Sequence, residues 1–262
     1  MKPRREMQVA ANPIVDNLLP HLKIDIRNTY PEVFLLPGDP ERVLWFADHA
    51  DTFELIAQNR EFTTAIAQKD GVHFGVASTG IGSGSTEIAV VELNRVGVGT
   101  LIRVGGCGAL QPGIPCGSFI INSGAVRMGG SSRWYVRPEF PAIADPFVCT
   151  ALAEAATAMG ESYFMGIGVS TDSYYEGQLR NSMELRSQDY SSQMEEHIRN
   201  RVLNFDMEAE TIFTLGYLFG MHTGAILGVH GNRATDTWLV DFKETQEKCI
   251  DIAVQAIKRL HQ

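Results

Sequence analysis

Leu101-Ile102-Arg103-Val104-Gly105-Gly106-Cys107-Gly108-Ala109-Leu110 begins as an apolar segment and ends in a run of glycines. Its first residues have the apolar, β-branched character of a buried strand. A charged Arg103 inside such a strand is costly unless it is paired, and ligands of open α/β sheets bind at the carboxyl ends of the strands. We therefore expect this segment to hold either an internal salt bridge or part of a ligand site.

Predicted strands of the same kind alternate with helical patterns along the chain. Besides Thr100–Val104, they are Val33–Leu36, Val72–Ala77, Ser118–Ile121, Phe164–Val169 and Ala225–Val229. Helical spacing of apolar residues follows Ser85 (Ala89, Leu93, Val96) and ends the chain (Cys249, Ile252, Ala256, Leu260). This alternation predicts an α/β fold in which helices cover both faces of a central mixed sheet.

The pattern contains no internal repeat and no Pro/Gly-rich linker. We expect a single domain over residues 1–262, in which residues 1–20 form a flexible or partner-contacting arm. The N-terminus carries no continuous apolar stretch, and no apolar run is long enough to span a bilayer. The sequence predicts neither a secretion signal nor a membrane segment.

Composition narrows the function classes further. The chain has 262 residues, 44% of them hydrophobic, and a formal net charge of -9, which disfavours a nucleic-acid binder because such proteins need a basic surface. Its cysteines are scattered without C-x-x-C spacing or nearby histidines, so neither a zinc site nor a disulfide framework is indicated. Reduced thiols fit a cytoplasmic protein best.

Two glycine-containing turns are candidate ligand loops. Pro37–Arg42 (sequence PGDPER) follows the first predicted strand, where Gly38 would let backbone N–H groups approach an anion and Arg42 would add charge. The same pattern is also typical of an ordinary turn. Residues 80–85 (GIGSGS) fail the dinucleotide fingerprint because Ser85 replaces its third glycine, so we expect a tight turn under an active site or at a subunit contact.

Two later segments carry groups that suit a nucleoside. Gln178 and Arg180 supply an amide and a guanidinium group for a planar base, and Asn204–Glu210 supplies carboxylates for a cis-diol. Simpler interpretations stay open. Glu208 at the start of an apolar helix also suits the helix dipole, Arg60 fits a solvated charge on a strand, and His21 fits a surface histidine.

Taken together, these segments resemble the nucleoside phosphorylases of the uridine phosphorylase type. The resemblance extends from His21 to the C-terminal helix. The matching segments are PGDP (37–40), REFTT (60–64), STGIG (78–82), RVG (103–105), Tyr174-x-x-Gly177-Gln178-x-Arg180, Met207-Glu208 and Asn232-Arg233. The resemblance implies a single-domain, three-layer fold with a barrel-like core, phosphate as co-substrate, and no cofactor.

The resemblance also implies roles for individual residues. The phosphate-binding positions are Gly38, Arg42, Arg103 and, from a neighbouring subunit, Arg60. The ribose-binding positions are Met207, Glu208 and, from across a dimer, His21. Tyr174 is expected to stack near the base, while Gln178 and Arg180 hydrogen-bond its edge and Arg233 supports them. The residues expected to act in catalysis are Arg103, Gln178, Arg180 and Arg233.

Because Arg60 and His21 are expected from a neighbour, the minimum assembly is a homodimer, and related bacterial enzymes stack three dimers into a hexamer. Glu61, Ile81 and Ser85 match positions that hold a potassium ion at the dimer interface. An exposed carboxylate and a helix-capping serine explain two of these residues without a metal.

The chain departs from the family at the candidate site. Gly106 stands where uridine phosphorylases carry a threonine, Asp206 replaces a glutamate, and His230 and Gly231 replace apolar residues beside the base. These positions predict a more polar and roomier pocket. We therefore carry three interpretations. The first is a pyrimidine nucleoside phosphorylase. The second is a relative that cleaves another nucleoside or nucleotide, or a nucleosidase that uses water, although the three phosphate arginines disfavour hydrolysis. The third is a catalytically silent nucleoside-binding protein.

Overall fold

The computed structural model describes residues 10–11, 13–180 and 191–260. Most of the expected N-terminal arm, residues 1–9 and 12, lies outside this part of the chain. Within the described portion of residues 1–20, Val15 and Leu18 form a bridge and the Leu19 side chain is fully buried in the core.

The strands form one mixed sheet with a closed barrel at its centre. Their bounds are β1 (Val33–Leu36), β2 (Thr52–Asn59), β3 (Phe62–Lys69), β4 (Val72–Ala77), β5 (Thr100–Ala109), β6 (Phe119–Met128), β7 (Ala142–Ile143), β8 (Tyr163–Thr171), β9 (Asn204–Asp206), β10 (His222–Asn232) and β11 (Thr237–Trp238). The barrel runs β5-β10-β6-β8-β9 and closes because β9 pairs with β5. From β5 the sheet extends through β1 and β4 to β3 and β2.

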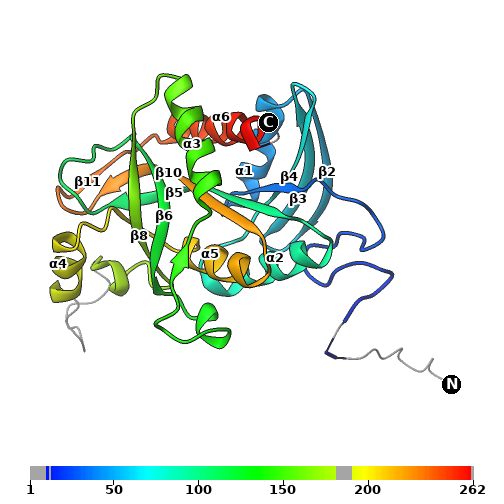
Figure 1. Cartoon of the computed structure of the whole chain (residues 1–262), viewed down its shortest axis with the longest axis horizontal. Coiled ribbons are helices and arrows are strands. Elements are labelled where there is room, and N and C mark those ends of the chain that lie inside the picture. The colour runs from blue at the N-terminus through cyan, green and yellow to red at the C-terminus, as the bar shows by residue number, and fades with distance from the viewer. Residues whose placement is uncertain (1–9, 12, 181–190, 261–262) are drawn as a thin grey trace.

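Helices cover the sheet on both sides. They are α1 (Pro40–Trp45), α2 (Ser83–Arg95), α3 (Pro146–Ala158), α4 (Ser191–Arg199), α5 (Ala209–Leu218) and α6 (Lys243–Leu260), with short 3-10 helices at Phe46–His49, Ser131–Trp134 and Glu176–Gln178. Figure 1 shows α3 and α6 together on one side of the sheet and α2 and α5 on the opposite side. The fold class expected from sequence is confirmed.

Strand β5 is longer than the apolar pattern predicts, because it continues past Val104 through the glycines to Ala109. The glycines have a steric purpose. A Cβ atom at Gly105 would lie 2.9 Å from Cζ of Arg103, whose side chain folds over the strand. A Cβ atom at Gly106 would lie 2.2 Å from Cε1 of His230. The strand therefore carries two large polar side chains over positions that have none of their own.

The predicted helices are present with small changes in their ends. Helix α2 ends at Arg95, so Val96 is its C-cap, and Glu208 is the N-cap of α5. The apolar face of α6 is buried and includes Cys249, Ile252 and Ala256. Among the helices in the described part of the chain, none combines the length and apolar character needed to cross a bilayer.

Candidate active site

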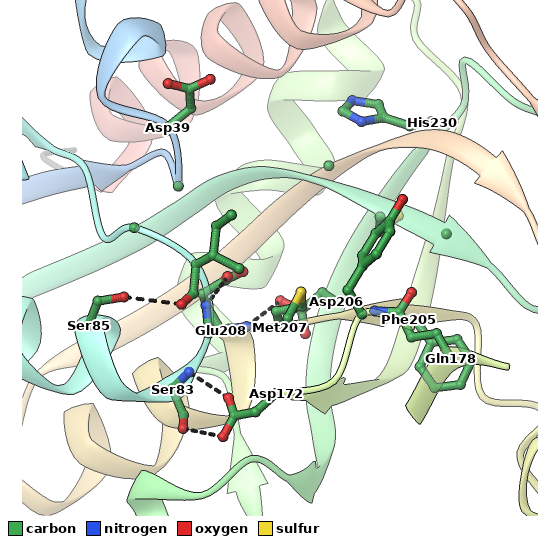
Figure 2. Close-up of a pocket in the computed structure, with 18 of the residues that line it drawn as sticks. Asp39, Ser83, Ser85, Asp172, Gln178, Phe205, Asp206, Met207, Glu208 and His230 are labelled. Carbon is green, nitrogen blue, oxygen red and sulfur yellow. Dashed lines mark hydrogen bonds between the residues drawn. The ribbon is translucent and has the colours of Figure 1, made fainter. Parts of the chain in front are cut away.

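A cavity of about 1030 Å³ opens at the carboxyl ends of β1, β4, β5 and β10 and is completed by the segments around β9 and after β8. Figure 2 shows Glu208 near its centre, Asp39 and His230 on one side, and Ser83 with Asp172 on the other. The expected site residues that line it are Gly38, Arg42, Arg103, Gly106, Tyr174, Gln178, Arg180, Asp206, Met207, Glu208 and His230. Residues from six separate chain segments thus meet around one cavity.

Arg103 is both paired and part of the cavity wall, so the two expectations for its strand hold together. It is only 4% exposed, its Nε donates to Asp206 at 2.9 Å, and its Nη2 pairs with Glu208. Burial lowers the pKa of Arg103, but the charges of Glu208 and Asp206 outweigh this and raise it. Among the described residues, no hydrogen-bond partner is present for its Nη1. Arg103 therefore remains charged and retains a free donor.

Arg42 brings a second positive charge to the same end of the cavity. Asp39 caps α1 by accepting a hydrogen bond from the Glu41 N–H at 2.8 Å, which sets the helix that presents Arg42. Arg42 donates from Nη1 to Oε1 of Gln246 at 2.8 Å. Burial and the nearby charge of Arg103 lower the pKa of Arg42. Two neighbouring guanidinium groups that are removed from water form a site for a multiply charged anion, and we call this the anion end of the cavity.

Glu208 sits beside the anion end and is held by the 80–85 turn. The backbone N–H of Gly82 donates to Glu208 at 2.7 Å, and Gly82 has a φ of 84°, which favours glycine. Burial raises the pKa of Glu208 in spite of the neighbouring Arg103. A buried carboxylate gains from additional O–H donors, and a cis-diol supplies two. The turn thus lies under the site, as one of the two expectations for it proposed.

Asp172 is a lining residue that the sequence did not reveal. Its carboxylate accepts hydrogen bonds from the N–H of Ser83 at 2.7 Å and the Ser83 hydroxyl at 2.6 Å (Figure 2), and from the N–H of Gly130 at 2.6 Å. It therefore ties the start of α2 to the segment after β6. No spacing signal marks Asp172, because its partners lie 89 and 42 residues away.

The opposite end of the cavity, which we call the base end, contains Tyr174, Gln178, Arg180 and Trp238. The Arg180 guanidinium lies 4.2 Å from the Tyr174 ring centroid and 5.7 Å from that of Trp238. Gln178 is 4% exposed. This arrangement combines aromatic surfaces with hydrogen-bond donors, which suits a flat heterocycle.

Two residues of β10 and its neighbourhood support the base end. A Cβ atom at Gly231 would lie 2.8 Å from the Trp238 ring, so the glycine makes room for this tryptophan. Arg233 does not line the cavity, but its Nη2 donates to the carbonyl of Leu179 at 3.2 Å, between Gln178 and Arg180. Trp238, like Asp172, has no sequence signal that would have identified it.

His21 and Arg60 lie outside the cavity of their own chain. His21 contacts Glu92 through Nδ1 at 2.7 Å with its side chain 38% exposed, and Arg60 is exposed in a turn with a φ of 56°. Glu61, Ile81 and Ser85 line the rim of the cavity, and the Ser85 hydroxyl donates to the carbonyl of Ile81 at 3.3 Å.

Comparison with known proteins follows the same segments. A family model described as "Phosphorylase superfamily" matches residues 32–261. The chain is 43% identical over 227 residues to the uridine phosphorylase of Thermococcus kodakarensis, covering 86% of this chain and 81% of that protein. It is 38% identical over 232 residues to the Escherichia coli uridine phosphorylase, covering 86% and 91%. It is 36% identical over 250 residues to a guanosine phosphorylase of Halorubrum lacusprofundi, covering 92% and 98%.

Proposed function

This chain belongs to the phosphorylase superfamily, and from that premise we propose that it cleaves the N-glycosidic bond of uridine with phosphate, giving uracil and ribose 1-phosphate. It is thus a pentosyltransferase of the uridine phosphorylase type. The observation that carries the proposal is the pair Arg42 and Arg103, which stands beside the buried Glu208 in one cavity with Gln178 and Arg180 at its other end. An anion, a ribose and a base can occupy these three regions in the order in which they react.

At the anion end, Arg42 and Arg103 would hold phosphate against the sugar. A phosphate oxygen forms the new bond to C1′ while the C1′–N bond breaks and its electron pair passes to the base. Positive charge develops on the sugar in between, so the phosphate dianion stabilises it as well as attacking it. The free Nη1 of Arg103 supports this role, because a buried donor without a partner is costly until a ligand accepts from it.

Glu208 and Met207 would position the ribose between the two ends. The Glu208 carboxylate accepts hydrogen bonds from the cis-diol, and Met207 supplies apolar contact from the same wall of the cavity. Asp206 holds Arg103 from behind, with Ser170 and the N–H of Ala209 as its further donors. The shorter carboxylate at position 206 therefore acts through Arg103.

At the base end, Gln178 and Arg180 would stabilise the leaving group. Uracil departs with negative charge on its carbonyl oxygens, and donors that face this charge lower the barrier by about 2.7–4 kcal/mol each in comparable sites. Arg233 holds the Leu179 carbonyl and so fixes the turn that carries both donors. An anion of this stability needs no separate general acid.

Guanosine is the second candidate substrate, because a guanosine phosphorylase is among the relatives that span nearly the whole chain. Its supporting observation is the base end itself, where Gly231 has no side chain and His230 replaces an apolar residue. Hydrolysis of a nucleoside, and binding without turnover, remain tests of the same site. Hydrolysis would leave Arg42 and Arg103 without an anion to bind.

The proposal includes a cytoplasmic homo-oligomer, either a dimer or a hexamer of three dimers, in which a partner chain brings Arg60 and His21 to the cavity. It is supported by the exposure of Arg60 and by the absence of both residues from the cavity lining of their own chain. Glu61, Ile81 and Ser85 would supply oxygen ligands for a potassium ion at the dimer interface. A hard cation fits a carboxylate, a carbonyl and a hydroxyl.

The test is uracil release from uridine, followed by ultraviolet absorbance with phosphate present and with phosphate removed. We expect release only with phosphate, together with ribose 1-phosphate. Release without phosphate would identify a nucleosidase. Parallel reactions with guanosine decide between the two substrates by their kcat/KM values, and binding without any turnover would identify a silent relative.

A further inference from the structure

His230 occupies the space that a side chain at Gly106 would need. An added Cβ at Gly106 would lie 2.2 Å from Cε1, 2.5 Å from Nδ1 and 2.9 Å from Nε2 of the imidazole. Both residues line the cavity, as do Arg42 and Arg103. The histidine thus takes over a part of the anion end that belongs, by position in the chain, to β5.

The imidazole ring is held in a fixed orientation. It stacks on Phe242 with ring centroids 4.0 Å apart and planes at 20°. Its Nε2 lies 2.8 Å from Nε2 of Gln246, a residue of α6 that is 1% exposed. The face and one edge of the ring are therefore occupied by α6 and the residue just before it, which leaves the Nδ1 edge toward Gly106.

The contacts of Gln246 determine which ring nitrogen carries the proton. Its Oε1 accepts from Nη1 of Arg42 at 2.8 Å, and its Nε2 donates to the carbonyl of Gly105 at 2.9 Å. Because guanidinium is only a donor and a carbonyl only an acceptor, these two bonds fix the amide orientation. The second hydrogen of the amide nitrogen then points at Nε2 of His230, which must accept it.

The neutral ring consequently carries its proton on Nδ1. Burial, with a smaller contribution from the charge of Arg42, lowers the pKa of His230 to about 4, so the ring is neutral near pH 7. Among the described residues, Nδ1 has no hydrogen-bond partner. A single amide thus connects the orientation of Arg42 with the tautomer of His230 on the opposite side of Gln246.

We propose that His230 is a substrate-binding residue of the anion end, whose Nδ1–H donates to the bound phosphate from the space above Gly106. Gln246 is the matching positioning residue, because it holds both His230 and Arg42. This inference rests on the proposed function, since it assumes that the anion is the phosphate co-substrate. It also explains why Gly106 lacks a side chain: a hydroxyl-bearing residue there and the histidine are alternative ways to supply one donor, and they exclude each other sterically.

The test compares two replacements of His230 that differ in the donor. His230→Phe keeps a flat ring on Phe242 but has no N–H, whereas His230→Asn places an amide nitrogen near the position of Nδ1. We expect His230→Phe to raise the KM for phosphate about tenfold, which is the size of one lost hydrogen bond to a charged group, and to leave the KM for uridine within about twofold. His230→Asn should stay within about threefold of the wild type.

A second pair of variants tests the steric exclusion. Gly106→Thr alone should weaken phosphate binding, and Gly106→Thr combined with His230→Ala should recover it to within about threefold of the wild type, since the threonine hydroxyl then has room. Equal phosphate KM values for wild type and His230→Phe, or equal losses in His230→Phe and His230→Asn, would overturn the inference. Wild-type uracil release that does not depend on phosphate would instead overturn the proposed function.

Discussion

The anion end and the base end of the cavity are built in different ways. At the anion end, Arg103 is 4% exposed and ion-paired with Asp206 and Glu208, and Arg42 is fixed by Gln246. At the base end, Arg180 lies between the rings of Tyr174 and Trp238, on segments outside the barrel strands except for the nearby end of β10. The first is a buried charged network on strands and helices, and the second is an aromatic bracket on turns.

This difference separates stability from specificity. Removing one member of a buried ion pair leaves the others uncompensated, so changes at the anion end should affect both folding and activity. Arg180 has no such buried charge partner, so changes around it should affect substrate binding and leave the fold intact. The predictions below test this division, beginning with the largest effect.

Arg103→Ala should lower kcat/KM by at least about 1000-fold and the free energy of unfolding by roughly 3–5 kcal/mol, because Asp206 and Glu208 lose their common partner. Steady-state assays and urea unfolding measure the two effects. Arg103→Lys is the control, and it should keep more stability than Arg103→Ala because it retains a charge. A stable, active Arg103→Ala protein would show that the network is not structural.

Arg180→Ala should lower kcat/KM for uridine by about 100-fold and change the free energy of unfolding by less than about 1 kcal/mol. The loss arises from the leaving-group contact alone. Arg199→Ala, which removes an arginine that is 68% exposed on α4, is the matched control and should retain full activity. A destabilised Arg180→Ala protein would contradict the division between the two ends.

The acid side of the stability profile should report on His230. The folded-state pKa is about 4 and the ordinary value is 6.5, so between these pH values the unfolded state binds a proton that the folded state does not. The free energy of unfolding should therefore fall as the pH drops from 6.5 to 4, by at most about 3 kcal/mol from this residue.

Carboxylates at the same site also titrate in acid, and Arg42, which faces the ring through Gln246, stays charged throughout. The difference between wild type and His230→Phe isolates the contribution of the histidine. Urea unfolding of both proteins at several pH values measures it. Parallel profiles for the two proteins would mean that His230 is protonated as readily in the folded state as in the unfolded one.

Trp238→Ala should have the smallest effect, raising the KM for the nucleoside by about five- to tenfold through loss of a stacking surface while the KM for phosphate is unchanged. Val240→Ala provides a control on a side chain that is 88% exposed just beyond β11. An equal rise in both KM values would place Trp238 in the general support of the cavity.

Much of this architecture follows from local sequence patterns. β1 and β4 match their predicted bounds, and the glycine turn and the Asn204–Glu210 segment both reach the cavity. These features depend on neighbours in sequence. The closure of the barrel does not, because β9 is only three residues long and its pairing with β5 joins residues far apart in the chain.

The residues that the sequence did not reveal act through distant partners. Asp172 caps α2, Trp238 packs over Gly231, and Gln246 joins Arg42 to His230. Gln246 had one usable signal, because it is a polar residue three positions before Cys249 on the apolar face of the last helix. Likewise, Gly106 and His230 look like two separate departures in sequence, and only the fold shows that they occupy one space.

The most direct test of the account is the fate of oxygen atoms in phosphate. Uridine is incubated with the protein and phosphate that carries ¹⁸O at all of its oxygens, and the sugar product is analysed by mass spectrometry. The account predicts ribose 1-phosphate that retains the full label of the phosphate, because a phosphate oxygen forms the new bond at C1′. Release of uracil with an unphosphorylated sugar as the only partner product would contradict it.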